Sequence, residues 1–254
     1  MERNLKKMFI RLTPGFIKRV LIKRKYLKYN KHVHQNNIAN GKVIKISCKN
    51  EEKYSFLKSV LKKSFSGFLN IDGYKVYFHP IAVIKVPKTI DAYLKEIGAK
   101  SRNMNVKAQR NGIVSKIFDW NKYLDDIYEI NTSSIKRQGR AMDKAYMQYP
   151  KKVNNLIEDD FKIEFIGAFV EEKLVGYIEL YIYGNFAMTN RILGHKDYLK
   201  FGVMNLMVKK CVEYGIENNI EYINYLTMQN RKNNSLSAFK KRVGFREYSL
   251  LELK

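Results

Sequence analysis

The order of elements in the last third of the chain constrains its fold more than any other feature. Several segments there have the apolar pattern of strands, and they cover 162–170, 174–183, 185–193, 221–228 and 245–252. Helices are predicted over 203–218 and from Ser235, capped near Asn234. Three successive strands predict a meander, and the loop that opens the longer helix predicts a cradle for a phosphate group.

The formal net charge of +24 favours a polyanionic partner such as a nucleotide cofactor, RNA or an anionic membrane. The alternative is a surface solvated by lysine, because the charge is spread along the whole chain. Cys48 and Cys211 form neither a disulfide framework nor a ligand cluster, which predicts a reducing cytoplasm, and Cys211 is expected in the core. No apolar run approaches the roughly 20 residues that span a bilayer, and no signal-peptide pattern is present.

Three regions are expected along the chain. Residues 1–35 form a basic segment in which apolar residues recur at helical spacing from Pro14. Such a helix lies on an anionic membrane or packs on its own domain. Residues 36–112 are predicted to be a small α/β region, and residues 113–254 the main domain.

Local signals predict the elements of the middle region. A helix is expected to start at Asn50, and Asp72-Gly73 is a hairpin signal. The remaining predictions are a strand over 76–86, a helix capped by Thr89, a basic stretch that stops at Gly112, a strand over 113–118, a helix from Asp119 to about Lys136 and a helix over 142–158.

The loop that enters the helix over 203–218 is the first candidate site. The free N–H groups and dipole of a helix N-terminus bind phosphate, Gly202 permits a close approach, and Lys200 adds a charge. The residues expected to contact the phosphate-bearing ligand are Lys200, Phe201, Gly202, Val203 and Met204.

The short basic helix before Gly244 is the second candidate site. Leu236, Phe239 and Val243 form an apolar stripe, and Lys240 lies off it. A lysine there can stabilise negative charge on a tetrahedral intermediate or on phosphate, or it can be a solvated surface residue like Lys241.

In element order, residues 113–252 resemble the GNAT acyltransferase fold. The closing Phe239-Lys240-Lys241-Arg242-Val243-Gly244 resembles the F-K-x-x-x-G pattern of the Fem-like branch, which includes peptidoglycan-bridge aminoacyltransferases. The stretch from Tyr93 to Gly112 is similar to that branch too. The resemblance implies an α+β fold with a mixed, mostly antiparallel central sheet flanked by helices, and a smaller N-terminal α/β extension.

The resemblance also implies chemistry. It implies acyl-CoA, first of all acetyl-CoA, as co-substrate, with Lys200, Gly202 and Val203 facing its phosphates and Lys240 near the reacting carbonyl. The sequence departs from the family in two places. The loop lacks the second small residue of R/Q-x-x-G-x-G/A, and Lys240 stands where ordinary members often carry a tyrosine.

Transfer to an amine needs a group that takes the ammonium proton. Glu179 shares a strand face with Tyr177 and Tyr181, and it is either a base in a cleft or an exposed carboxylate. His195 and Asp197 after the third strand are the other candidates, although a loop histidine is the simpler interpretation of His195. Basic and amide side chains expected to bind substrate are Arg137, Arg140, Asn190 and Arg191.

Three functions compete at this point. The first is an N-acyltransferase that acts on an amine of a cell-envelope or polysaccharide precursor. The second keeps the fold and uses aminoacyl-tRNA as donor. The third is a non-catalytic basic protein that docks on membrane or nucleic acid. A cytoplasmic protein is expected, peripheral at the inner membrane face if residues 1–30 bind anionic lipid. No metal site is expected, because His32, His34 and His79 lack further ligands nearby.

Overall fold

The computed structural model describes residues 15–47, 61, 65, 67–137, 140–153, 157–158, 161–228 and 234–252, and it describes only the backbone of 15–25, 140, 157–158 and 234. Most of the helix predicted from Asn50 therefore lies outside the described residues. Leu61 and Phe65, which belong to it, are fully buried. They contribute to a core with Tyr77, Phe186 and Leu250.

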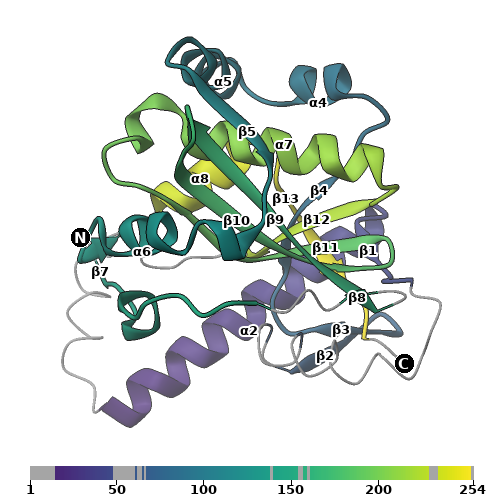
Figure 1. Ribbon diagram of the computed structural model, residues 1–254. Helices are drawn as coiled ribbons and strands as arrows, with labels where there is room; N and C mark the ends of the chain where they lie inside the picture. The colour runs from purple at the N-terminus through teal and green to yellow at the C-terminus, as the bar shows by residue number, and fades with distance from the viewer. Residues whose placement is uncertain are drawn as a thin grey trace.

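Nine strands form the central sheet of the described chain (Figure 1). They are β1 (Val43–Ile44), β4 (Ile81–Lys85), β5 (Ile113–Ile117), β8 (Ile157–Glu158), β9 (Phe161–Val170), β10 (Lys173–Tyr183), β11 (Phe186–Gly194), β12 (Tyr222–Thr227) and β13 (Arg246–Leu250). Their order is β1-β13-β4-β12-β11-β10-β9-β5, with β8 beside β9. Neighbours are antiparallel except β11–β12 and β1–β13, which confirms the predicted mixed, mostly antiparallel α+β fold.

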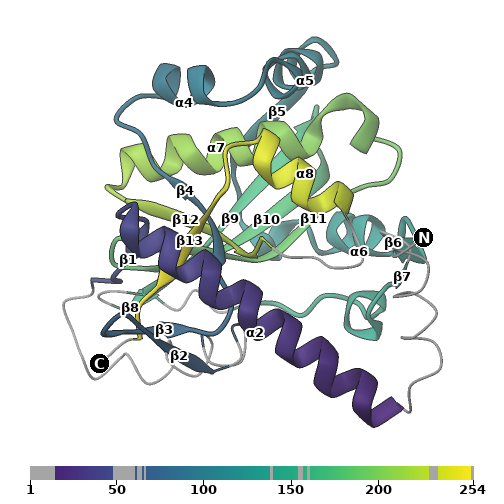
Figure 2. The same cartoon turned by 180° about the vertical axis from the view of Figure 1, so that it is seen from behind.

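Helices cover both faces of this sheet (Figures 1 and 2). On one face α7 (Val203–Glu217) and α8 (Asn234–Arg242) pack over the strands, and α4 (Ile90–Glu96) and α5 (Ala99–Arg110) form an outer layer on α7. On the other face lies α6 (Leu124–Thr132), over a cluster that contains Trp120, Phe165 and Tyr177. The short elements are the strands β2 (Phe68–Ile71), β3 (Tyr74–Tyr77), β6 (Lys136–Arg137) and β7 (Arg140–Ala141), and the 3-10 turns η2 (Trp120–Lys122), η3 (Lys144–Met147) and η4 (Leu199–Phe201).

Most local signals predicted the right element. Asp72 and Gly73 have φ angles of 47° and 81° in the β2–β3 turn, as a tight hairpin requires. Thr89 accepts a hydrogen bond from the Ala92 N–H at the start of α4, and Gly112 ends the α5 segment with φ of 70°. Cys211 is buried on α7, as expected.

One predicted helix is shorter than expected, and a second is wrong. The segment from Asp119 forms η2, capped by the Asp119 side chain, and then α6, which ends at Thr132 instead of continuing to Lys136. The described residues of 142–158 form η3 and, at its end, strand β8, and Gln148 has extended backbone angles. Pro150 explains the second error, because a proline disfavours helical backbone at the residue before it and removes a hydrogen-bond donor.

Strand β4 comes from the region predicted to be separate, yet it lies inside the main sheet. It pairs antiparallel with β12 on one side and with β13 on the other. All four residues from Ile81 to Ile84 are buried, which suits a strand covered on both faces. The division of the chain into domains 1–35, 36–112 and 113–254 stays a prediction. The central sheet, however, contains strands from both sides of the boundary between residues 112 and 113.

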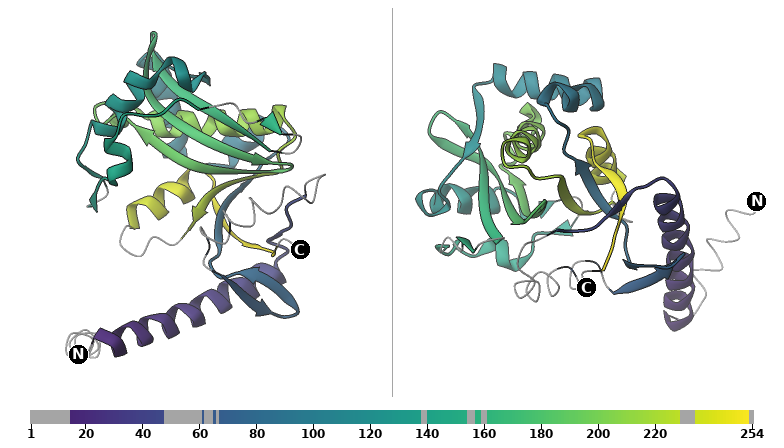
Figure 3. Two further views of the ribbon diagram at one scale, coloured as in Figure 1. Left: turned by 60° about the horizontal axis from the view of Figure 1, so that its bottom comes forward. Right: turned by 90° about the vertical axis from the view of Figure 1, so that its right-hand side faces the viewer.

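Helix α2 (Gly15–Ala39) lies along the β13 edge of the molecule (Figure 3). Its described half is fixed by buried polar side chains: His34 Nδ1 lies 2.8 Å from Ser249 Oγ, and Asn30 Nδ2 donates to the Phe78 carbonyl at 2.8 Å. The predicted helix is therefore present, while the side chains of Phe16 to Leu21 lie outside the described residues. None of the described helices is both long enough and apolar enough to cross a bilayer.

Candidate functional site

The site lies where β11 and β12 part. The two strands pair in parallel only from Phe186 to Met188 and from Tyr222 to Asn224, and beyond these residues no ladder joins them (Figure 3). A cavity of about 390 Å³ lies between their diverging ends. The splayed strands thus create a cleft inside an otherwise continuous sheet.

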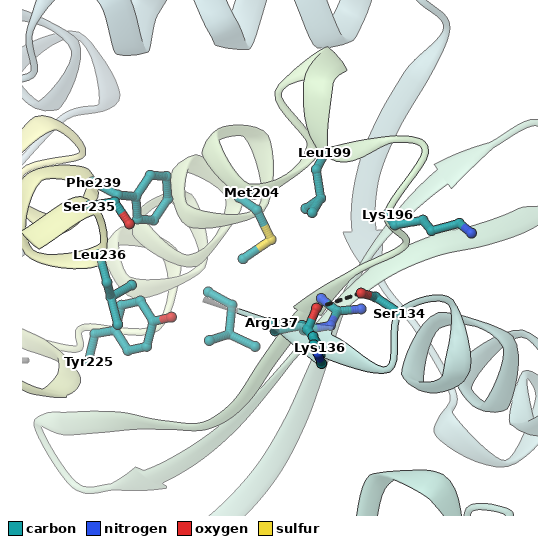
Figure 4. Close-up of a pocket in the computed structure, with 11 residues that line it drawn as sticks. Ser134, Lys136, Arg137, Lys196, Leu199, Met204, Tyr225, Ser235, Leu236 and Phe239 are labelled. Atoms are coloured by element: carbon teal, nitrogen blue, oxygen red, sulfur yellow. Dashed lines mark hydrogen bonds between the residues drawn. The ribbon is translucent and has the colours of Figure 1, made fainter. Parts of the chain in front are cut away.

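The two sides of this cavity differ in chemistry (Figure 4). One side is cationic and carries Lys136, Arg137 and Lys196, with the Ser134 hydroxyl beside them. Leu236, Phe239 and Tyr225 lie opposite these cations with Ser235 near them (Figure 4), and Ile192, Leu199 and Met204 complete a mainly apolar lining. None of the described lining residues is acidic.

Arg137 holds the end of β11. Its two Nη atoms donate to the carbonyls of Gly194 (3.0 Å) and Ile130 (2.9 Å), and to Ser133 Oγ at 3.3 Å. Its Nε is buried without a hydrogen-bond partner among the described residues. Burial lowers the pKa of this guanidinium, but an arginine stays charged in water at any ordinary pH.

Lys240 holds the end of β12 in a similar way. Its Nζ donates to the carbonyls of Tyr225 (2.8 Å) and Thr227 (2.7 Å), and it lies 4.1 Å from the Tyr225 ring centroid. Leu226, between these carbonyls, has φ of +49°, so the strand is irregular here. Lys240 is only 3% exposed, and burial lowers its pKa from 10.5 to about 8. The interpretation as a solvated surface lysine is therefore wrong.

A bulge in β11 brings three predicted residues together on the α6 face. Glu179 pairs with Arg191 and Leu180 with Thr189, so Asn190 is an extra residue in the strand. Asn190 Nδ2 donates to Glu179 Oε2 at 2.8 Å, and Arg191 Nε lies 3.4 Å from the same oxygen.

Glu179 is buried, so the prediction of an exposed carboxylate is wrong. Desolvation raises its pKa, and Arg191, Asn190 and Tyr181 oppose that shift. A carboxylate with a raised pKa is a stronger base than an ordinary one. This group meets the electrostatic requirement for accepting a proton from an amine.

The α6 face and the cavity are connected electrostatically through the gap between the strands. Tyr146 of η3 interacts with Glu179 and Arg137, and the Arg191 guanidinium lies 5.8 Å from its ring centroid. Tyr146 also contributes to the raised pKa of Tyr225, whose hydroxyl points into the cavity (Figure 4). Tyr146 therefore lies within electrostatic range of Glu179 on the α6 face and of Tyr225 at the cavity.

The helix N-terminus predicted to hold phosphate is closed. Val203 is 0% exposed and Gly202 is buried, so neither backbone N–H reaches solvent. Gly202 has φ of +92°, and a Cβ on it would collide with the Met104 carbonyl of α5. The glycine serves close packing against α5 rather than the approach of a ligand. Of the five residues predicted to contact the cofactor, Met204 lines the cavity.

The other candidates take different positions. Lys200 is exposed, and its Nζ lies 5.0 Å from the Phe201 ring centroid. His195 turns toward α6, with Nε2 3.6 Å from Glu129 Oε1 and Nδ1 3.7 Å from Asp197 Oδ2, and it is absent from the cavity lining. Only the backbone of Arg140 is described, in β7 opposite Arg137.

Sequence reasoning missed four residues of this site: Lys136, Lys196, Tyr146 and Tyr225. Lys136 and Lys196 lie in basic or loop segments with many similar lysines, and Tyr146 lay in a segment predicted as helix. No local signal distinguishes Tyr225 from other strand tyrosines. Within the described ranges no group of three or more potential ligands is arranged for a metal ion.

Comparisons with known proteins agree with this architecture. Residues 124–245 match the model of the Acetyltransferase (GNAT) family. The crystal structure of FemX superposes with a TM-score of 0.54 at 12% identity, covering 80% of this chain and 68% of FemX. No curated protein sequence matches the chain.

Two other solved structures are similar at lower scores. L-PGS from Bacillus licheniformis has a TM-score of 0.45 and 13% identity, with coverage of 76% of this chain and 63% of L-PGS. The paia N-acetyltransferase of Thermoplasma acidophilum, in complex with coenzyme A, has a TM-score of 0.41 and 18% identity, with coverage of 54% and 96%. The chain spans 58% to 68% of the length of the first three solved structures that it resembles. Residues 124–245 thus match the GNAT acetyltransferase family model, and the FemX superposition shows that the fold around them is shared.

Proposed function

We propose that this protein transfers an acyl group from an activated, phosphate-bearing donor to an amine, with acyl-CoA as the first candidate donor. The observation that carries the proposal is the gap between β11 and β12, which has a cavity on the α7 side and a buried carboxylate on the α6 side. Two substrates that approach from opposite sides can meet in such a gap without displacing each other.

The open edge of β11 supports the proposal. Beyond Met188 no described strand pairs with β11 on its β12 side, so backbone groups before Gly194, whose carbonyl accepts from Arg137, can bind a ligand. An extended donor arm with amide groups, such as that of coenzyme A, can pair with this edge as an added strand does. Such pairing positions the acyl carbon near the Asn190 bulge.

The chemistry then needs a free amine and a polarised carbonyl. The amine nitrogen attacks the acyl carbon, its proton passes to Glu179 or to a water held by it, and the bond to the leaving group breaks. Arg191 and Asn190 hold the Glu179 carboxylate in place. Lys240 contributes positive charge next to Tyr225 rather than direct contact, because its ammonium is bonded to backbone carbonyls.

A transfer assay with purified full chain tests the proposal. It is incubated with acetyl-CoA, or with longer acyl-CoA donors, and a panel of amines that includes amino sugars and peptidyl lysine. Mass spectrometry follows acylated product and free coenzyme A, with Glu179→Gln as the control. Product that forms with the wild type and falls with the variant supports the proposal, and the absence of product from every donor class refutes it.

Aminoacyl-tRNA is the second candidate donor. Helix α5 carries Lys100, Arg102, Lys107 and Arg110 and no acidic residue, and it covers the start of α7, where coenzyme A phosphates would otherwise bind. The resemblance to the Fem-like branch points the same way. Transfer from tRNA should weaken steeply with salt, whereas turnover of acyl-CoA should be less sensitive.

The acceptor and location are also proposals. The Fem-like resemblance favours an envelope or polysaccharide precursor as acceptor, and the basic residues 1–30 favour contact with an anionic membrane surface. Sedimentation with vesicles of phosphatidylglycerol, compared with phosphatidylcholine, tests the second point. Binding that survives deletion of residues 1–30 would refute it.

A further inference from the structure

The cationic side of the cavity has no anion to balance it in the described chain. This surface, called the β6 wall here, consists of Ser134, Lys136, Arg137 and Lys196. We infer that the β6 wall is the phosphate-binding site of the donor, in place of the loop before α7. The inference rests on the proposed function, and it names the residues that hold the donor's phosphate.

The start of α7 is unsuited to that task. The Gly202 N–H already donates to the Leu199 carbonyl at 3.3 Å, and Val203 is fully buried. The Met104 carbonyl oxygen packs directly on Gly202. A phosphate there would need to displace α5 and would meet a carbonyl oxygen, which repels an anion.

The β6 wall has the opposite properties. Lys136 and Lys196 are exposed, and no described carboxylate forms an ion pair with either of them or with Arg137. Arg137 is held in place by hydrogen bonds to Gly194, Ile130 and Ser133, and it lines the cavity. Preorganised guanidinium and ammonium groups are the side chains that bind phosphate most strongly.

The shape of the cavity fits a donor that is polar at one end. The apolar part of the lining, which includes Met204, Leu236 and Phe239, suits an acyl chain or a pantetheine-like arm. A cavity of about 390 Å³ lies within the size range of small-molecule sites and admits such an arm.

Binding of inorganic pyrophosphate to the full chain, measured by titration calorimetry, tests the inference. The variants are Lys136→Gln, Lys196→Gln and the double change, with Lys200→Gln as matched control because Lys200 is an exposed lysine of the rejected loop. Each single change should weaken binding about tenfold and the double change more, while the control changes it less than about twofold. Thermal unfolding verifies that every variant is folded.

Two results overturn the inference. One is that Lys200→Gln weakens pyrophosphate binding and the double variant does not, and the other is that the wild type binds no pyrophosphate at millimolar concentration. Competition by coenzyme A or by a short RNA ending in CCA then separates the two sources of phosphate. If pyrophosphate binds as expected but no donor supports transfer, the proposed function fails and the phosphate site stands.

Discussion

The ends of β11 and β12 are held by different cations in two different settings. Arg137 donates to the last carbonyl of β11, and Lys240 donates to two carbonyls at the end of β12. Neither cation has a carboxylate among the groups that shift its pKa. Arg137 lines the cavity, whereas Lys240 is buried beside Tyr225 and lies outside the lining.

This difference separates two tasks that a cation can have at the ends of these strands. A cation that reaches the cavity can contact a ligand, and a cation enclosed by protein fixes the shape of the strand that forms the wall. Arg137 does both, because its Nη atoms bind backbone while the residue lines the cavity. Lys240 does the second and adds a positive potential near Tyr225.

The largest expected effect concerns the structural task of Lys240. Lys240→Ala removes the donor to the buried Tyr225 carbonyl and one donor to the Thr227 carbonyl, and it opens a void, so the free energy of unfolding should fall by about 3 kcal/mol. Urea unfolding measures this, with the exposed Lys241→Ala as control, for which less than about 0.5 kcal/mol is expected. A loss below about 1 kcal/mol for Lys240→Ala would show that Lys240 does little to hold the end of β12 in place.

The third buried charge at the gap, Glu179, provides the next test. Glu179→Gln keeps the shape and removes the base, so kcat should fall about 100-fold with little change in the donor's KM. Because burial raises the Glu179 pKa, the wild-type rate should decline as the pH falls through that raised pKa, and the variant should lack this decline. An unchanged rate would mean that another group acts as the base. Glu179 would then not be the anionic group that works with the cations Arg137 and Lys240 in the mechanism.

The substitution Arg137→Lys tests whether Arg137 contributes to ligand binding. A lysine keeps the charge but cannot bond Gly194 and Ile130 at once, so the KM for the donor should rise about tenfold and kcat should change less. Steady-state kinetics over a range of donor concentrations measures the split. The same rise in KM for Lys240→Met would contradict the division of tasks between the two cations.

The smallest expected effect is the pH dependence of stability. The folded-state pKa of Lys240 is lowered to about 8 from 10.5, so between these values the unfolded chain binds more protons than the folded one. Stability contributed by this position should therefore rise with pH in that window, by about 1 kcal/mol between about pH 8 and about pH 9. The difference in unfolding free energy between wild type and Lys240→Met, measured across the window, isolates this contribution. A flat difference would mean that Lys240 stays charged in its buried position.

Local patterns predicted the elements around the site better than the site itself. The meander, α7 and the short basic helix lie where their apolar spacing indicated, because each is fixed by its own sequence. The helix over 142–158 failed because Pro150 outweighs the helix-forming residues around it. The strand position of Glu179 was predicted, but its burial depends on Asn190 and Arg191 from the next strand.

The roles of Lys240 and Gly202 were not accessible from the sequence for a similar reason. The acceptors of Lys240 are backbone carbonyls, which every residue carries, so no side-chain pattern reveals them. The contact that closes the start of α7 joins Gly202 to Met104, and a glycine looks the same in sequence whether it faces a phosphate or a helix. Long-range packing decides between these cases.

The position of β4 between β12 and β13 has a consequence for how the chain is made. The ribosome completes β4 long before it completes either partner strand. While the rest of the chain is synthesised, β4 therefore has no partner strands to cover its apolar residues, which are Ile81, Ala82, Val83 and Ile84. In the last folding step, β4, which is made early, must pair with β12 and β13, which are made late. This pairing joins segments far apart in the sequence, so it should be slow. Nascent chains stalled before β13 should remain open to proteases and chaperones at β4, even when the meander has already formed.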